Sequence, residues 1–358
     1  MSGPLIPNDV IGDRYEIIRY LDEGGMQFVY VARDQLTDRL VALKTPKNRS
    51  AQKRFRRSAI MAARVNHPNV AKTLDYVRDG DQRYLIEELI EGKDLKAALL
   101  KDTAFLDPFL AAKVLHHLAK GVAAAHHAGV IHRDLKPTNI MVVDDYSLTG
   151  LKITDFGIAK LADEELQDAV EGGDASMTTS QTAVGALPYM APEAIERPKD
   201  VGAPADIWSI GAMIYHLLSG QYPFGQGLKA VPQIIAAQLP EVPNFLISNP
   251  QFTPLAQEVM DIALICLKKE PAERPTADQL VERCSELCYT SSPRERGTVI
   301  SFSYGAYGFI GGPMGDVFFH RECVYGDMPA VGSRVLFSSY DGGGAPRALP
   351  VLKLNFGD

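Results

Sequence analysis

The sequence comprises 358 residues, a length that suggests two or three domains. Apolar residues make up 46% and charged residues 23%, as in a globular protein with a substantial core. The net charge of −7 excludes a general electrostatic attraction to nucleic acid or anionic membranes, so any nucleic-acid contact must be local. No secretory signal, no membrane-length apolar run and no paired metal-ligand spacing among the four cysteines is seen, which favours a cytoplasmic protein without membrane contact.

The first part of the chain is predicted to be rich in strands. Residues Tyr15–Leu21 and Phe28–Ala32 indicate two strands around a glycine-containing turn. Leu40–Thr45 and Arg83–Leu89 indicate two more, and Gln52–Val65 indicates the one helix of this region.

Helical periodicity begins at Asp107 and dominates to about Tyr289. Pro108 occupies the first turn of a candidate helix, where its missing amide hydrogen costs nothing. Apolar side chains then recur on one face of that helix, at Leu110, Val114, Leu118 and Val122. This part of the chain is therefore expected to form a helical unit with its own core.

The composition changes again after a polar segment, residues 290–293. Short strands separated by glycines are expected at Thr298–Tyr304, Gly308–Ile310, Val317–His320, Arg334–Ser338 and Leu349–Leu354. Their number and spacing predict a small all-β barrel.

Residues suited to phosphoryl transfer follow one another along the first 280 residues. This reaction needs a cation for the nucleotide phosphates, metal ligands, and a carboxylate beside the incoming hydroxyl. Lys44 ends a strand, the segment 132–139 reads His-Arg-Asp-Leu-Lys-Pro-Thr-Asn, and Asp155 precedes Phe156 and Gly157. An Ala-Pro-Glu triplet at 191–193, Asp206 and Arg274 complete the series.

In this order and spacing, these motifs resemble the Hanks-type protein kinase family over roughly Tyr15 to Tyr289. The resemblance implies an α+β protein with the two-lobed protein kinase fold, a strand-rich N-lobe and a helical C-lobe. We expect an N-terminal tail at 1–13, a kinase domain at 14–289 with lobes at about 14–90 and 91–289, a linker at 290–296, and the barrel at 297–358.

The resemblance also implies roles for individual residues. Asp134 would accept the proton of the substrate hydroxyl, Lys136 would neutralise the transferred phosphoryl group, and Lys44 would pair with ATP phosphates. Asn139 and Asp155 would hold Mg²⁺. The resemblance places further residues around ATP, namely Gly24, Gly25, Val29, Ala42 and Glu88. It assigns structural roles to Glu193, Asp206 and Arg274.

Two positions of the nucleotide site depart from the family pattern. The phosphate loop carries Asp22 and Gln27 where the family has glycine, which predicts weaker nucleotide binding. The helix expected at 52–65 has no acidic residue, and Ser58 stands where a glutamate should pair with Lys44. Glu87 is a candidate substitute because a buried carboxylate needs a cation. The alternative, that Glu87 points elsewhere, is equally compatible with the sequence.

The activation segment also differs from the pattern, because Ala186 replaces a threonine that links the substrate loop to Asp134. Arg133 precedes Asp134, an arrangement that favours regulation by phosphorylation of this segment. The candidate phosphorylation sites are Ser176, Thr178, Thr179, Ser180 and Thr182. A polar surface loop without regulation is the alternative.

From Gly297 the chain resembles a cold-shock domain, an OB-type barrel that binds single-stranded RNA or DNA. The resemblance implies a stacking platform of four side chains, Tyr307, Phe309, Phe318 and His320. Ser301 replaces an expected tryptophan and Gly305 an expected lysine, and acidic residues balance basic ones from Arg294 onward. Two interpretations therefore stay open: nucleic-acid binding, or a barrel whose rings pack on the kinase or a partner.

Together these features predict an ATP- and Mg²⁺-dependent serine/threonine protein kinase that autophosphorylates and modifies proteins. Its barrel would bind single-stranded nucleic acid or regulate the kinase. The alternative function is a non-catalytic, ATP-sensing pseudokinase scaffold that acts through RNA or protein binding. The sequence leaves open the protein substrates, the rate of the enzyme and whether the chain forms a homodimer.

Overall fold

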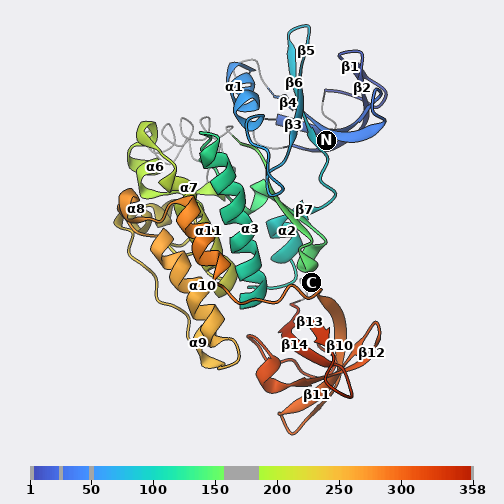
Figure 1. Cartoon of the computed structure of the whole chain (residues 1–358), viewed down its shortest axis with the longest axis vertical. Coiled ribbons are helices and arrows are strands. Elements are labelled where there is room, and N and C mark those ends of the chain that lie inside the picture. Colours follow the sequence, from blue (N-terminus) through green and yellow to red (C-terminus); the bar gives the residue numbers. More distant parts are fainter. Residues whose placement is uncertain (1–3, 24–26, 48–51, 157–184, 356–358) are drawn as a thin grey trace.

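A computed structural model describes residues 4–23, 27–47, 52–156 and 185–355. Its described parts form a strand-rich lobe, a helical lobe and a closed barrel (Figure 1). The expected fold class, a two-lobed α+β unit followed by a small all-β barrel, is confirmed.

The N-lobe is built on a six-stranded sheet with the order β1-β2-β3-β4-β6-β5. The strands are β1 (Val10–Ile11), β2 (Tyr15–Glu23), β3 (Gln27–Asp34), β4 (Arg39–Pro46), β5 (Thr73–Asp79) and β6 (Gln82–Glu88). Helix α1 spans Gln52–Ala62 and packs Phe55 and Ala59 against Leu85 of β6. The helix thus ends before Val65, the expected end, and the sequence did not predict β1 or β5.

The C-lobe is mainly helical. Its α-helices are α2 (Leu95–Leu99), α3 (Pro108–His127), α6 (Pro192–Glu196), α7 (Pro204–Ser219), α8 (Val231–Ala236), α9 (Phe245–Ser248), α10 (Thr253–Cys266) and α11 (Ala277–Ser285). A three-stranded sheet of β7 (Lys93–Asp94), β8 (Ile140–Val143) and β9 (Gly150–Ile153) lies in the order β7-β8-β9. The β8–β9 hairpin places the end of segment 132–139, here called the catalytic loop, beside the segment that carries Asp155, because Ile140 pairs with Ile153.

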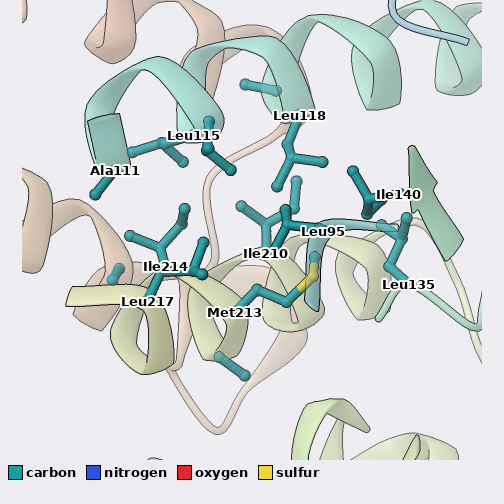
Figure 2. Close-up of a cluster of buried hydrophobic side chains, with 14 of the residues drawn as sticks. Leu95, Ala111, Leu115, Leu118, Leu135, Ile140, Ile210, Met213, Ile214 and Leu217 are labelled. Atoms are coloured by element: carbon teal, nitrogen blue, oxygen red, sulfur yellow. The ribbon is translucent and has the colours of Figure 1, made fainter. Parts of the chain in front are cut away.

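Helices α3 and α7 form the centre of this lobe. Figure 2 shows Leu115 and Leu118 of α3 facing Ile210, Met213 and Ile214 of α7. All of these side chains are buried. The apolar face predicted for α3 is confirmed, since its four predicted positions are buried too. This packing gives the catalytic loop, which follows α3, a rigid base.

The barrel closes in the strand order β10-β11-β12-β14-β13. Its strands are β10 (Glu295–Ser303), β11 (Tyr307–Gly312), β12 (Gly315–His320), β13 (Arg334–Tyr340) and β14 (Arg347–Lys353). Alternate side chains such as Val299, Ile310, Phe319 and Phe337 fill its core. Strand β10 begins two residues before Gly297, so Glu295 and Arg296 belong to the barrel sheet and not to a linker.

The barrel is packed against the helical lobe (Figure 1). Tyr325, 1% exposed, lies in an aromatic group with Phe105, Phe245 and Phe252, with ring centroids 5.2–5.9 Å from its own. Asn249 donates hydrogen bonds to the carbonyl oxygens of two barrel residues. The two units therefore share one apolar core.

No helix among the described residues is long and apolar enough to span a membrane.

Candidate active site

The register of three adjacent strands determines which side chains lie on the face of the N-lobe sheet that carries Lys44, here called the cleft face. Lys44 of β4 lies opposite Val29 of β3, and Ala42 lies opposite Glu87 of β6. Directly opposed residues of antiparallel strands share a face, and so do residues two apart in one strand. Gln27, two residues before Val29, is on this face as well. Lys44 and Glu87 are therefore diagonal neighbours on the sheet.

Lys44 forms ion pairs with two carboxylates. Its Nζ lies 2.6 Å from Glu87 Oε2 and 2.8 Å from Asp155 Oδ1, and the lysine is 6% exposed. Burial by itself would lower the pKa of Lys44, but Asp155 and Glu87 outweigh it and leave the pKa above its ordinary value. The ammonium group is thus held in its charged form inside the protein.

Glu87 is a buried carboxylate beside this lysine. Burial raises the pKa of Glu87 above its ordinary value, and the nearby Lys44 acts in the opposite direction. The structure thus brings together the two residues that the sequence singled out as a candidate pair. Helix α1, whose residues include no carboxylate, contributes no anion to Lys44.

Asp155 lies directly after the β8–β9 hairpin and has a left-handed backbone, with φ of 62°. Its Oδ1 accepts hydrogen bonds from Lys44 Nζ and from Gln27 Nε2, each at 2.8 Å. Burial acts to raise the pKa of Asp155, but the contacts with Lys44 and Gln27 outweigh it and leave the pKa below its ordinary value. The group is therefore an anion suited to hold a cation.

The catalytic loop brings Asp134, Lys136 and Asn139 together. Lys136 Nζ lies 2.8 Å from Asp134 Oδ2, and Asn139 Nδ2 donates to the same oxygen at 3.0 Å. Asn139 also donates to the Asp134 carbonyl oxygen at 2.8 Å. These bonds orient one carboxylate beside one ammonium and one amide, and they direct the amide oxygen of Asn139 away from Asp134.

Asp206, 1% exposed at the start of α7, anchors the backbone of this loop. Its carboxylate accepts hydrogen bonds from the amides of His132 and Arg133, at 2.9 and 2.8 Å. His126 at the end of α3 lies 2.9 Å from the same carboxylate. Arg133 has a φ of 67°, a conformation that most side chains disfavour and that these bonds hold in place.

Glu193 and Arg274 form a bidentate ion pair, with Nη–Oε distances of 2.6 and 2.8 Å. Arg274 also donates to the carbonyl oxygens of Pro204, Lys268 and Lys269. The pair lies in the C-lobe, away from Lys44 and Asp155, and ties α6 to the segment before α11.

The remaining residues expected around ATP take different positions. Ala42 is buried and Val29 half-buried on the cleft face of the sheet. The Glu88 carboxylate accepts from Lys152 Nζ at 2.7 Å and from the Lys72 backbone amide at 2.8 Å, so its side chain links the end of β6 to β9 and to the segment before β5.

Several expected site residues lie outside the described residues. They are Gly24, Gly25 and the five candidate phosphorylation sites Ser176, Thr178, Thr179, Ser180 and Thr182. Ala186, which is described, is buried beside the short helical turn Leu187–Tyr189.

The expected aromatic residues of the barrel share its outer surface. Phe309 pairs with Phe318 and Tyr307 with His320 across β11 and β12, so all four lie on one face. The Tyr307 ring is stacked 6.1 Å from Phe318, and Phe309 lies 5.7 Å from Phe318. The orientation of the His320 ring is restricted, because its Nδ1 accepts a hydrogen bond from the Glu322 backbone amide.

The contacts of three residues at these sites were not predicted from the sequence. Gln27 was expected only as an obstacle to phosphates, yet it donates to Asp155. Tyr304, 93% exposed, extends the ring group beside Tyr307 at 6.4 Å, and its position just before the glycine of the turn could have identified it. No pattern in the sequence indicated the hydrogen bond from Lys152 to Glu88.

Comparison with known proteins identifies the class that this fold and site define. Residues 15–284 match the model of the protein kinase domain, so the chain belongs to the protein kinase family. The matched segment ends before the barrel.

Similar curated proteins are bacterial serine/threonine kinases. A probable serine/threonine-protein kinase, PknB, of Corynebacterium glutamicum is 33% identical over 290 residues, covering 78% of this chain and 43% of that protein. The serine/threonine-protein kinase PrkC of Bacillus subtilis is 31% identical over 269 residues, covering 74% of this chain and 39% of that protein. The chain thus spans less than half the length of these relatives.

Solved structures show the same fold. The kinase domain of Mycobacterium tuberculosis PknI, crystallised as a point mutant, superimposes with a TM-score of 0.57 at 22% identity. The match covers 80% of this chain and 99% of that one.

Proposed function

We propose that the chain is an ATP- and Mg²⁺-dependent serine/threonine protein kinase that autophosphorylates and modifies protein substrates. The observation that carries this proposal is the hydrogen-bonded arrangement of Lys44 with Asp155, and of Asp134 with Lys136 and Asn139, at the junction of the lobes. Phosphoryl transfer needs these groups in two sets, one for the nucleotide and metal and one for the hydroxyl.

The residues present fit a nucleotide-bound magnesium ion. Mg²⁺ prefers oxygen ligands, and the anionic Asp155 and the amide oxygen of Asn139 are such ligands. Bound Mg²⁺ would neutralise charge on the phosphates during transfer. Lys44 would hold the phosphates, Asp134 would orient and deprotonate the substrate hydroxyl, and Lys136 would stabilise the transferred group.

Glu87 takes the role that a carboxylate of the N-lobe helix has in the family. It lies 2.6 Å from Lys44 Nζ, whereas α1 carries no acidic residue. Because Glu87 belongs to a central strand of the sheet, its pairing with Lys44 does not depend on where α1 lies. Lys44 would therefore keep its position without movement of the helix.

Label transfer from γ-labelled ATP with Mg²⁺ tests the proposed activity. The purified chain should incorporate phosphate, and Asp134→Asn should abolish incorporation. Asp145→Asn is the matched control, because Asp145 is a carboxylate of the same lobe that pairs with Lys93 at the surface. Nucleotide binding without incorporation would overturn the kinase proposal in favour of a non-catalytic ATP-sensing scaffold.

For the barrel we propose binding of single-stranded nucleic acid through its outer ring group. Tyr304, Tyr307, Phe318 and Phe309 form a continuous series of ring contacts with centroids 5.7–6.4 Å apart. Strand β11 lies on the side of the barrel far from the helical lobe (Figure 1). Exposed rings stack on any base, so the site would tolerate different sequences.

The test is oligonucleotide binding by the full chain. Tyr307→Ala and Phe318→Ala should each weaken binding roughly tenfold, the loss expected for one base–ring stack. Val331→Ala, an exposed apolar position elsewhere on the barrel, should leave binding unchanged. Affinity should depend weakly on salt, because basic and acidic residues balance in this domain. Equal binding by all variants would contradict the proposal.

A further inference from the structure

Gln27 reaches from the N-lobe to Asp155 of the C-lobe. It is the first residue of β3 and shares the cleft face with Val29, which lies opposite Lys44. The residue is 6% exposed, and its Nε2 donates to Asp155 Oδ1 at 2.8 Å. A residue of the phosphate-loop strand thus contacts the carboxylate proposed to hold the metal.

The orientation of the Gln27 amide is determined by its partner. Asp155 forms an ion pair with Lys44, and an ionised carboxylate only accepts hydrogen bonds, so the donor atom Nε2 must face Asp155. The carbonyl oxygen Oε1 then lies on the other side of the same planar group. Oε1 is buried and has no hydrogen-bond partner among the described residues. A buried acceptor without a donor costs free energy, which a ligand that supplies a donor would recover.

The chemistry of the nucleotide limits what that donor is. This step rests on the proposed binding of ATP and Mg²⁺ at this cleft. Phosphate oxygens are acceptors and cannot satisfy Oε1. Magnesium ions at phosphates usually keep several water molecules, and these water molecules are donors. A hydrated metal ion next to Asp155 therefore supplies the missing group.

We propose that Gln27 is a positioning residue for the hydrated metal ion of the nucleotide complex. Its Nε2 holds Asp155 on the Oδ1 side, where Lys44 also binds, and its Oε1 accepts a hydrogen bond from metal-coordinated water. Glycine, the residue that the family pattern has at this position, offers neither group. The chain's affinity for nucleotide is accordingly more dependent on Mg²⁺ than it would be with glycine at this position.

Calorimetric titration with AMP-PNP, a non-hydrolysable ATP analogue, tests this inference in the full chain. Binding is measured with Mg²⁺ and with EDTA for the wild type and for Gln27→Leu, which has a similar size and no polar atoms. Gln82→Leu, at the exposed first residue of β6, is the matched control. With Mg²⁺, we expect Gln27→Leu to bind AMP-PNP about tenfold more weakly than the wild type, because a hydrogen bond in a charged environment is lost. With EDTA, the two proteins should bind AMP-PNP equally well.

Other results overturn the inference. An equal loss of affinity in both solutions would mean that Gln27 contacts the nucleotide itself. Tighter binding of AMP-PNP by Gln27→Leu than by the wild type in the presence of Mg²⁺ would mean that Gln27 obstructs the metal. If Gln27→Leu does not fold, Gln27→Gly provides the same comparison. Failure of the wild type to bind AMP-PNP at all would instead contradict the proposed kinase function.

Discussion

Lys44 is held by two carboxylates from elements other than α1, Glu87 on β6 and Asp155 after β9. The Lys44 and Glu87 side chains are buried, and that of Asp155 is half-buried. The excess of negative charge over positive charge in this trio favours the entry of a further cation. At the scale of the residue, these charges support the proposed binding of a metal–nucleotide complex.

The Glu87→Gln variant tests the role of this pair. Removing the charge should let Asp155 alone attract Lys44, so that Nζ moves away from the phosphate position. We expect about a tenfold loss of ATP affinity, which is the effect expected when one charged contact is perturbed. Phosphate transfer should fall as well. Glu91→Gln, an exposed carboxylate close in sequence, is the control. Unchanged binding and transfer in Glu87→Gln would contradict the assignment.

His216 should make stability depend on pH. Burial in α7 lowers the pKa of His216 to about 4, and its ring lies 4.0 Å from that of Tyr222. The unfolded chain binds a proton below about pH 6.5. The free energy of unfolding should therefore fall as the pH drops from about 6.5 to about 4, by up to roughly 3 kcal/mol from this group.

Denaturant unfolding between pH 4 and pH 8 measures this effect. His216→Gln should show a weaker pH dependence than the wild type in that window. Comparison at pH 8, where the histidine is neutral in both states, isolates the direct cost of the substitution. Parallel curves for the two proteins across the window would exclude the predicted role.

At the scale of the element, helix α3 connects the barrel with the catalytic loop. Asp107 caps its N-terminus by accepting from the amides of Phe109 and Leu110. Arg294, just before β10, binds the same carboxylate at 2.7 and 2.8 Å, with both side chains almost completely buried. At the other end of α3, His126 contacts Asp206, which fixes the backbone of the loop. One rigid helix therefore spans both contacts.

Breaking the buried pair should be costly. Arg294→Met leaves Asp107 buried without its cation, and we expect a loss of about 3 kcal/mol in the free energy of unfolding. Adding Asp107→Asn should recover most of this loss, because asparagine is a good N-cap and carries no charge. Arg296→Met breaks a more exposed pair with Asp102 and should cost less than about 1 kcal/mol. A loss in Arg294→Met no larger than in this control would contradict the prediction.

At the scale of the whole molecule, barrel and C-lobe share a core. Tyr325 belongs to the same buried group as the C-lobe helices, and a side chain at Gly326 would lie 2.3 Å from the Phe105 ring. The backbone amide of Asn355 also donates a hydrogen bond to the Asp102 carbonyl oxygen at 2.7 Å. Such packing predicts that C-lobe and barrel unfold together.

Calorimetric unfolding of the full chain tests this coupling. Tyr325→Ala should lower the midpoint of the transition shared by C-lobe and barrel, since truncating a buried aromatic side chain costs about 3–5 kcal/mol. Tyr304→Ala, at the exposed end of the ring group, should leave the midpoint unchanged. Separate transitions for barrel and C-lobe in the wild type would show that the two units are not coupled.

Much of the fold could be predicted because the patterns of apolar residues within short segments indicate its helices and strands. The periodic apolar face of α3 and the alternating strands β2 to β4 are properties of short segments. Strand β5 was missed because all of its residues are half-buried or exposed, so its apolar residues do not form a clear alternation. The end of α1 was placed too late because apolar residues such as Val65 continue past the helix and pack on the core from a turn.

The sequence by itself determined that the proposed catalytic residues Asp134, Lys136 and Asn139 lie close together, since they belong to one loop. It also pointed to Glu87 as a candidate partner for Lys44, but left an alternative open. Only the tertiary structure joined Gln27 to Asp155, 128 residues apart, and Arg294 to Asp107, 187 residues apart. Such contacts depend on how lobes and barrel pack, and a buried polar group takes whichever partner that packing brings within hydrogen-bond distance.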